Sequence, residues 1–140
     1  MPHTHPVLIA EDDEDVVFFL QRIFRKQGIQ NPLKFVPDGQ QALDYLETET
    51  RPPRVALLDI KMPVKDGFDV LKRVRAHPKL SRLPVVMFSN SREERDVNRA
   101  YDLGANSYVV KPGGVGEMED FVGKLHDYWI NVNEMPTVRE

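Results

Sequence analysis

The sequence predicts a doubly wound α/β fold with a five-strand parallel sheet. Five short apolar runs without polar alternation are separated by segments whose apolar residues recur at helical spacing. Strands of this kind are buried on both faces, as happens in parallel sheets covered by helices on both sides. The chain has 140 residues, which is about the length of one domain.

The first half of the chain supplies three strands and two helices. The predicted strands are residues 7–10, 33–36 and 55–58. The first helix has one apolar face and ends at Gly28; the face consists of Val16, Val17, Leu20, Ile23 and Phe24. Asp38 is the expected N-cap of the second helix, which buries Ala42, Leu43 and Leu46 and ends before Pro52.

The second half supplies two strands and three helices. The strands are residues 85–88 and 107–110. One helix is marked by Phe68, Leu71 and Val74, and the next covers residues 92–103 and ends at Gly104. The last helix is the most regular, with apolar residues at Met118, Phe121, Val122, Leu125, Tyr128, Trp129 and Val132. We therefore predict one domain over residues 1–132 and a short C-terminal tail over residues 133–140.

Composition excludes several classes of protein. Nineteen basic and 22 acidic residues give a net charge of −3, which disfavours the basic face that nucleic-acid binding requires. The chain has no cysteine, which excludes disulfides, thiol nucleophiles and cysteine-bound zinc. No apolar run approaches the roughly 18–20 residues that cross a bilayer, and the apolar run at residues 7–10 is shorter than a signal peptide requires. We expect a cytoplasmic protein without a nucleic-acid or membrane partner.

Polar residues follow four of the five predicted strands. The first strand ends in Glu11-Asp12-Asp13, the third in Asp59, the fourth in Ser89 and the fifth in Lys111. The carboxyl ends of parallel strands lie on one edge of the sheet, where ligands of such folds bind. We therefore expect several carboxylates, a hydroxyl and an ammonium group to converge there.

Carboxylates that share a pocket repel one another unless a cation lies between them. With oxygen ligands and no cysteine, the expected cation is Mg²⁺, with Mn²⁺ as a substitute. Asp12 and Asp59 suit direct ligation, and Glu11 a more distant position. A carboxylate can attack phosphorus to form an aspartyl phosphate, while Lys111 and Ser89 offset the phosphoryl charge. The alternative is that the acids after the strands only cap the following helices, as we expect for Asp13.

The motifs, in this order, resemble the receiver domain of two-component response regulators. They are Glu11-Asp12-Asp13, the run from Leu57 to Gly67 (LLDIKMPVKDG), Ser89, and Tyr108-Val109-Val110-Lys111-Pro112. The resemblance covers about residues 6–130. It implies a flavodoxin-like (βα)5 fold with strand order 2-1-3-4-5.

The resemblance also implies roles for the residues of the metal site and acceptor. Asp59 corresponds to the phospho-acceptor and also ligates the metal. Asp12 corresponds to a direct metal ligand, Glu11 to its acidic neighbour, and the backbone carbonyl of Lys61 to a further ligand.

Further roles concern the phosphoryl group and the response to it. Lys111 corresponds to the lysine that pairs with the phosphate, followed by a cis bond to Pro112. Ser89 corresponds to the hydroxyl that binds a phosphoryl oxygen. Tyr108 corresponds to the switch aromatic, which turns inward when that hydroxyl moves toward the phosphate. Gly67 is expected to supply a backbone angle that other residues resist.

The implied function is a phosphorelay response regulator that accepts a phosphoryl group from a sensor histidine kinase. Its chemistry would be limited to self-phosphorylation from a phosphodonor and autodephosphorylation, and no DNA-binding output domain fits after the last helix. The Tyr128-Trp129 pair, the extended end and the run 105–108 resemble single-domain regulators paired with bacterial phytochrome histidine kinases. A bacteriophytochrome is therefore the candidate kinase.

The last helix carries more apolar surface than packing on the sheet requires. Trp129, Ile130 and Val132 lie near or beyond the edge of the expected core. Surplus apolar surface of this kind marks an interface. We expect a homodimer through the last helix, with the fourth helix as an additional candidate contact.

Two other functions are compatible with the same residues. Gly113-Gly114 stands where receivers often carry an apolar residue, which should loosen the loop after Lys111 and favours a phosphorylation-independent pseudo-receiver that binds protein. A metal-dependent phosphoester hydrolase would need a second acid two residues after the nucleophile, where this chain has Lys61. The hydrolase is therefore the weaker alternative.

Overall fold

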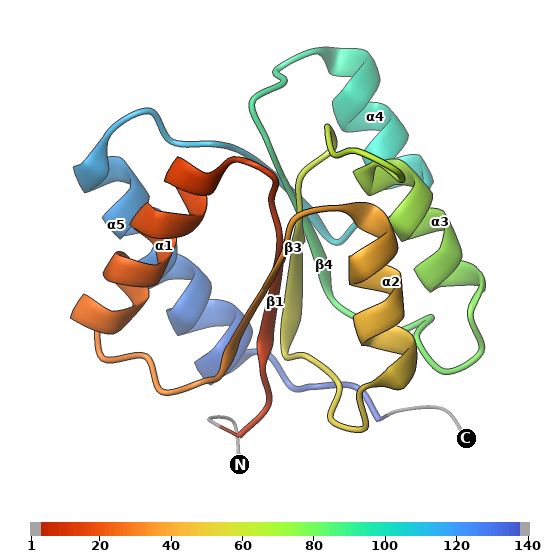
Figure 1. Ribbon diagram of the computed structural model, residues 1–140, viewed down its shortest axis with the longest axis horizontal. Coiled ribbons are helices and arrows are strands. Elements are labelled where there is room, and N and C mark those ends of the chain that lie inside the picture. The colour runs from red at the N-terminus through yellow and green to blue at the C-terminus, as the bar shows by residue number, and fades with distance from the viewer. Residues whose placement is uncertain (1–3, 138–140) are drawn as a thin grey trace.

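The computed structural model describes residues 4–137 and contains one parallel sheet with strand order β2-β1-β3-β4-β5 (Figure 1). The strands are β1 (Val7–Ala10), β2 (Leu33–Val36), β3 (Val55–Leu58), β4 (Val85–Ser89) and β5 (Ser107–Val110). The helices are α1 (Glu14–Lys26), α2 (Gly39–Thr48), α3 (Gly67–Ala76), α4 (Glu94–Asp102), α5 (Val115–Leu125) and the π-helix η1 (His126–Val132). The predicted fold class and strand order are confirmed.

Helices cover both faces of the sheet. α1 and α5 lie on one side, and α2, α3 and α4 on the other (Figure 1). Because strand side chains alternate between faces, β1 sends Val7 and Ile9 to the first layer and Leu8 and Ala10 to the second. All four are buried, which explains why the strand shows no polar alternation.

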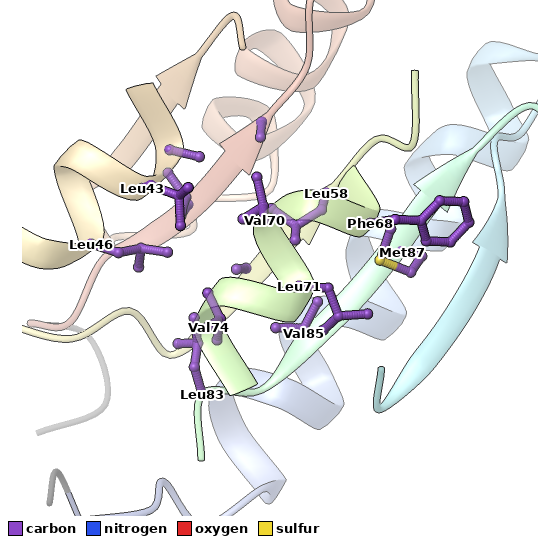
Figure 2. Close-up of a cluster of buried hydrophobic side chains, with 14 of the residues drawn as sticks. Leu43, Leu46, Leu58, Phe68, Val70, Leu71, Val74, Leu83, Val85 and Met87 are labelled. Atoms are coloured by element: carbon purple, nitrogen blue, oxygen red, sulfur yellow. The ribbon is translucent and has the colours of Figure 1, made fainter. Parts of the chain in front are cut away.

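The second layer is held by α2 and α3. Figure 2 shows Leu43 of α2 and Val70, Leu71 and Val74 of α3 packed over strand residues such as Leu58. Burying each such side chain stabilises the fold by about 1.5–3 kcal/mol. α3 therefore keeps a set orientation directly after the loop that follows β3.

Aspartates begin three of the helices, two of them as predicted. Asp13 accepts hydrogen bonds from the backbone N–H groups of Asp15 (2.9 Å) and Val16 (3.5 Å) at the start of α1. Asp38 caps α2 through the N–H of Gln41 at 2.8 Å. Asp66 begins α3 with a reciprocal capping box. These caps satisfy backbone donors close to the carboxyl edge of the sheet.

The C-terminal segment differs from the single regular helix that we predicted. Leu125 and Ile130 are both buried and are five positions apart, which is the spacing of a π-helix. The prediction that Ile130 forms surplus surface is therefore wrong, because the wider turn rotates it into the core. Tyr128 and Val132 are exposed, and Trp129 is half-buried.

Two arginines hold the opposite, amino edge of the sheet together. Arg54, before β3, places Nη2 within hydrogen-bonding distance of the carbonyl oxygens of Trp129 (3.3 Å), Ile130 (2.5 Å) and Asn133 (2.7 Å).

Arg75, at the end of α3, donates to the carbonyls of Gly104 (2.8 Å), Ser81 (3.2 Å) and Leu83 (2.7 Å), and to Asn106 Oδ1 at 3.0 Å. Burial lowers the pKa of Arg75 from its usual value. Each guanidinium thus joins segments that are distant in sequence.

Candidate functional site

The carboxyl ends of the strands surround a cavity of about 860 Å³. Parallel pairing aligns Ala10 with Leu58, so the residues that follow these two strands lie side by side. The cavity is lined by Glu11, Asp12, Asp13, Asp59, Ile60, Lys61, Ser89, Asn90, Ser91, Arg92, Glu93, Arg95, Asp96 and Lys111. The predicted convergence of Glu11, Asp59, Ser89 and Lys111 is therefore present.

Lys111 is held between two carboxylates. Its Nζ lies 2.8 Å from Asp59 Oδ2 and 2.7 Å from Glu11 Oε1. The side chains of Lys111, Asp59 and Glu11 are 6%, 7% and 1% exposed, so solvent screens these contacts weakly. Burial alone would lower the pKa of Lys111, but its hydrogen bonds to Asp59 and Glu11 raise it above its usual value. The lysine is therefore a fixed positive charge.

Burial disfavours the negative charge of Glu11. Burial raises its pKa from 4.5 to about 7, with a smaller contribution from the charge of Asp59. Hydrogen bonds from Lys111 and from the backbone N–H of Asp13 oppose this rise. Lys111 alone therefore does not compensate the buried negative charge.

The acidic side chains can accommodate a divalent cation. One oxygen from each of Glu11, Asp12 and Asp59 lies within 4.8 Å of the others. Mg²⁺ binds oxygen at about 2.1 Å, retains waters, and usually uses one or two carboxylates directly. Asp12 is exposed, whereas Glu11 and Asp59 are buried, so a cation would enter from the side of Asp12. The donor set fits Mg²⁺ or Mn²⁺.

The loop after Asp59 is shaped by a close approach and a strained turn. Gly67 does not have a positive φ, so the expected reason for this glycine is wrong. Its constraint is steric, because a Cβ there would overlap the carbonyl oxygen of Asp59. Val64 has φ 68°, and the Lys65 N–H donates to the Pro63 carbonyl at 2.8 Å across it, forming a γ-turn. A β-branched residue is strained in this left-handed region.

Ser89 ends β4 with its hydroxyl at the cavity wall. Its Oγ accepts a hydrogen bond from the N–H of Ser91 at 3.1 Å, so its own proton can be donated into the cavity. Tyr108 of β5 does not line the cavity; its hydroxyl donates to the carbonyl of Ser91 at 2.8 Å. The two predicted switch residues therefore meet at Ser91.

One expectation for the segment after β5 is wrong. Within residues 4–137 every peptide bond is trans, including Lys111–Pro112. An X–Pro bond favours trans by about 0.5–1 kcal/mol, and this bond keeps the favoured isomer. Lys111 itself is held at both ends, because its backbone N–H donates to the Ser89 carbonyl at 2.8 Å and its ammonium group contacts two carboxylates.

Sequence reasoning missed one site residue with a clear contact. Asp96 of α4 accepts a hydrogen bond from the Ser91 hydroxyl at 2.6 Å and lines the cavity. Serine and aspartate five positions apart at a predicted helix start are a weak signal. This spacing could have suggested a contact between Ser91 and Asp96. It could not have suggested that Tyr108 is linked to the same pair.

The fold and the site define a class: doubly wound α/β proteins with an acidic, cation-compatible pocket beside a buried lysine. The family model of the response regulator receiver domain matches residues 7–122. This match covers most of the chain, which therefore belongs to the response regulator receiver domain family. In the described residues, no helix is long and apolar enough to cross a membrane.

Several of the similar proteins are response regulators associated with phytochromes. Response regulator Rcp1 of Synechocystis sp. is 30% identical over 135 residues, which are 93% of this chain and 92% of the relative. The phosphorylated cyanobacterial phytochrome response regulator RcpA superimposes with a TM-score of 0.89 at 28% identity, over 96% of this chain and 99% of that chain. The Mn²⁺-bound form of Rcp1 superimposes with a TM-score of 0.85 at 28% identity, over 95% of this chain and 99% of that chain. This chain is thus related to phytochrome-associated response regulators.

Proposed function

We propose that this chain is a phosphorelay response regulator whose Asp59 accepts a phosphoryl group from a sensor histidine kinase. The observation that carries the proposal is the buried Asp59 carboxylate, which lies 2.8 Å from Lys111 beside two further acids. An Asp59 oxygen attacks phosphorus, and the bond between phosphorus and the kinase histidine breaks, with its electrons returning to the imidazole. Attack by water on the phosphorus later releases inorganic phosphate and restores the carboxylate. Apart from this self-phosphorylation and autodephosphorylation, we assign no enzymatic activity.

Asp12, Asp59 and the backbone carbonyl of Lys61 would hold Mg²⁺ or Mn²⁺, with Glu11 as the more distant acid. Lys61 lines the same cavity as the three acids. The cation supplies charge compensation for the carboxylates and for a phosphoryl group. The relative Rcp1 has a Mn²⁺-bound form, which supports the same assignment by similarity.

Lys111 and Ser89 would stabilise the phosphoryl oxygens. The Lys111 ammonium already lies against Asp59, so it needs little reorganisation to meet a new negative charge. Ser89 can donate its proton into the cavity. A phosphoryl oxygen that accepts this proton would favour the arrangement in which Ser89 is linked through Ser91 to Tyr108. Phosphorylation would thereby favour one arrangement of the surface near β4 and β5.

The phytochrome-associated relatives and the exposed apolar surface near α5 indicate two kinds of partner. The relatives named for phytochrome make a bacteriophytochrome the candidate kinase. An apolar cavity of about 460 Å³ lies between β5 and α5, beside Trp129. Val132, three residues after Trp129, is 66% exposed. We propose a homodimer through α5 and η1, with α4 as an additional contact. We also propose that the protein is cytoplasmic, where it would meet its histidine kinase.

The test is the intact mass of the protein after incubation with Mg²⁺ and acetyl phosphate. Wild type should gain one phosphoryl adduct of about 80 Da, and Asp59→Asn none. Asp102→Asn, which removes an exposed acid at the end of α4, is the matched control and should gain the adduct. An adduct on Asp59→Asn equal to that on wild type would refute the proposed acceptor.

The pseudo-receiver alternative predicts no adduct on wild type although Mg²⁺ binds. Its support was the Gly113-Gly114 pair, and Lys111 is tightly held despite these glycines. A phosphoester hydrolase remains disfavoured by Lys61, which cannot act as the second carboxylate.

A further inference from the structure

The loop between β4 and α4 contains a side-chain pair that the proposed phosphoryl transfer does not use. The Ser91 hydroxyl donates to Asp96 Oδ2 at 2.6 Å. The same hydroxyl oxygen accepts the backbone N–H of Glu93 at 3.2 Å. The pair therefore ties the loop to the first turn of α4. The bond is short and charge-assisted, which makes it stronger than a neutral hydrogen bond.

The backbone of Ser91 connects this pair to both predicted switch residues. Its N–H donates to Ser89 Oγ at 3.1 Å, and its carbonyl accepts the Tyr108 hydroxyl at 2.8 Å. The Ser89 hydroxyl, the Tyr108 ring and α4 thus meet at one residue. A rotation of the Ser91 backbone would break the contacts to Ser89 and Tyr108 together.

α4 has few other anchors at its first turn. Within the described chain, Ala100 is its one buried residue, and its N-cap, Glu93, makes no side-chain capping bond. By contrast, α3 has five buried residues and a capping box. The position of the β4–α4 loop therefore depends strongly on the Ser91–Asp96 bond.

We propose that Asp96 is a positioning residue that holds Ser91, and through it Tyr108 and Ser89, in the arrangement seen here. By accepting the Ser91 hydroxyl, Asp96 keeps the Ser91 carbonyl within reach of Tyr108 and the Ser91 N–H within reach of Ser89. The consequence for phosphorylation rests on the function proposed above. A residue that populates this arrangement raises the affinity of Asp59 for a phosphoryl group that binds Ser89.

The hydrogen-bond role is tested first in the metal-free protein. Fluorotyrosine labelling gives one ¹⁹F signal for each of the four tyrosines, and Tyr108→Phe assigns that of Tyr108. Asp96→Ala and Ser91→Ala should both shift the Tyr108 signal toward that of an exposed tyrosine. Asp96→Asn is the second variant if Asp96→Ala fails to fold, and should shift it less.

Two controls separate this role from general effects on α4. Glu94→Gln removes the other acid of the first turn and should leave the Tyr108 signal unchanged. Ser91→Thr retains the hydroxyl and should also keep the wild-type signal. A wild-type Tyr108 signal in folded Asp96→Ala, or an equal shift in Glu94→Gln, would overturn the proposal.

The functional consequence is measured with beryllofluoride and Mg²⁺ as a stable mimic of the phosphoryl group. Asp96→Ala should weaken beryllofluoride binding roughly tenfold, whereas Glu94→Gln should not. In the Tyr108→Phe background the same substitution should weaken it only about threefold, because one of the two contacts that Asp96 supports, the one to Tyr108, is already absent. If Asp96→Ala weakens beryllofluoride binding equally in the wild-type and Tyr108→Phe backgrounds, Asp96 only stabilises the helix and the proposal is overturned.

The proposed function can fail independently of this role. If wild type binds no beryllofluoride but Asp96→Ala still shifts the Tyr108 signal, Asp59 is not the acceptor and Asp96 still positions Tyr108. If wild type binds beryllofluoride and Asp96→Ala leaves the Tyr108 signal unchanged, the proposed acceptor site stands and Asp96 does not position Tyr108.

Discussion

The two edges of the sheet use charged side chains in opposite ways. At the amino edge, Arg54 and Arg75 direct their guanidinium groups at neutral carbonyl and amide oxygens of several segments. At the carboxyl edge, Lys111 faces Glu11 and Asp59, with Asp12 close by. Arginine donors that bind carbonyl and amide oxygens stabilise the fold, whereas an excess of carboxylates prepares a site for a cation and a phosphoryl group. Function is therefore concentrated at the edge where negative charge is left uncompensated.

The largest effect is expected from breaking the amino edge. Arg75→Met should lower the free energy of unfolding by about 3 kcal/mol, because it leaves several oxygens without their donor. Arg75→Lys should recover little, since one ammonium cannot reach acceptors spread over four residues. Chemical denaturation measures both. Arg82→Met, an exposed arginine at the same edge, should change stability by less than about 0.5 kcal/mol. Comparable losses in both methionine variants would refute the assigned role.

A second substitution addresses the carboxyl edge. Asp12→Asn should weaken Mg²⁺ binding roughly 100-fold while leaving the unfolding free energy of the metal-free protein nearly unchanged, since Asp12 is exposed. Isothermal titration calorimetry gives the affinity. Glu14→Gln, which removes an exposed acid outside the cavity, should bind Mg²⁺ as wild type does. Unchanged affinity in Asp12→Asn would remove Asp12 from the metal site.

A pH titration tests whether the carboxyl edge holds uncompensated charge. The pKa of Glu11 is raised from 4.5 to about 7, so between these values the folded state binds the proton more tightly than the unfolded state. This contribution to stability is complete below pH 4.5 and is lost as pH rises to about 7. In metal-free protein at pH 8, Glu11→Gln should therefore be more stable than wild type by about 2 kcal/mol.

The control for that measurement is the same pair of proteins at pH 4.5. There Glu11 is protonated in the folded state, and the two unfolding free energies should agree within about 0.5 kcal/mol. A constant difference across the whole pH range would show that the substitution changes packing and not charge.

The smallest effect concerns strain beside the acceptor. Val64→Asn should raise the free energy of unfolding by about 1 kcal/mol, because asparagine tolerates the left-handed region that valine resists. Thermal unfolding measures it, with Val115→Asn, another exposed valine without a positive φ, as the control. A loss of stability in Val64→Asn would mean that the γ-turn is not strained.

Much of the fold and site could be predicted because it depends on local patterns and one topological rule. Apolar runs identified the strands, and parallel pairing placed Glu11, Asp59, Ser89 and Lys111 together. The π-helical turn could not be foreseen, since a five-residue step differs from an α-helical one only once Ile130 is known to be buried. Long-range contacts such as the carbonyls bound by Arg75 depend on the assembled fold and leave no spacing in the sequence.

The glycine after Asp66 shows a subtler limit. The sequence identified Gly67 as constrained, but conformational freedom and close approach both select glycine, and no pattern separates them. The overlap with the Asp59 carbonyl appears only when α3 is placed against the end of β3. The Ser91–Asp96 pair was missed for a similar reason, because its importance comes from its link to Tyr108.

The central claim is that the uncompensated charge at the carboxyl edge makes Asp59 a phosphoryl acceptor. The most direct test is to phosphorylate wild type with acetyl phosphate and Mg²⁺, reduce the acyl phosphate with borohydride, and locate the modified residue by tandem mass spectrometry. Our account predicts that residue 59 alone is converted to homoserine. Conversion at Asp12 or Asp13, or no conversion in protein that binds Mg²⁺, would contradict it.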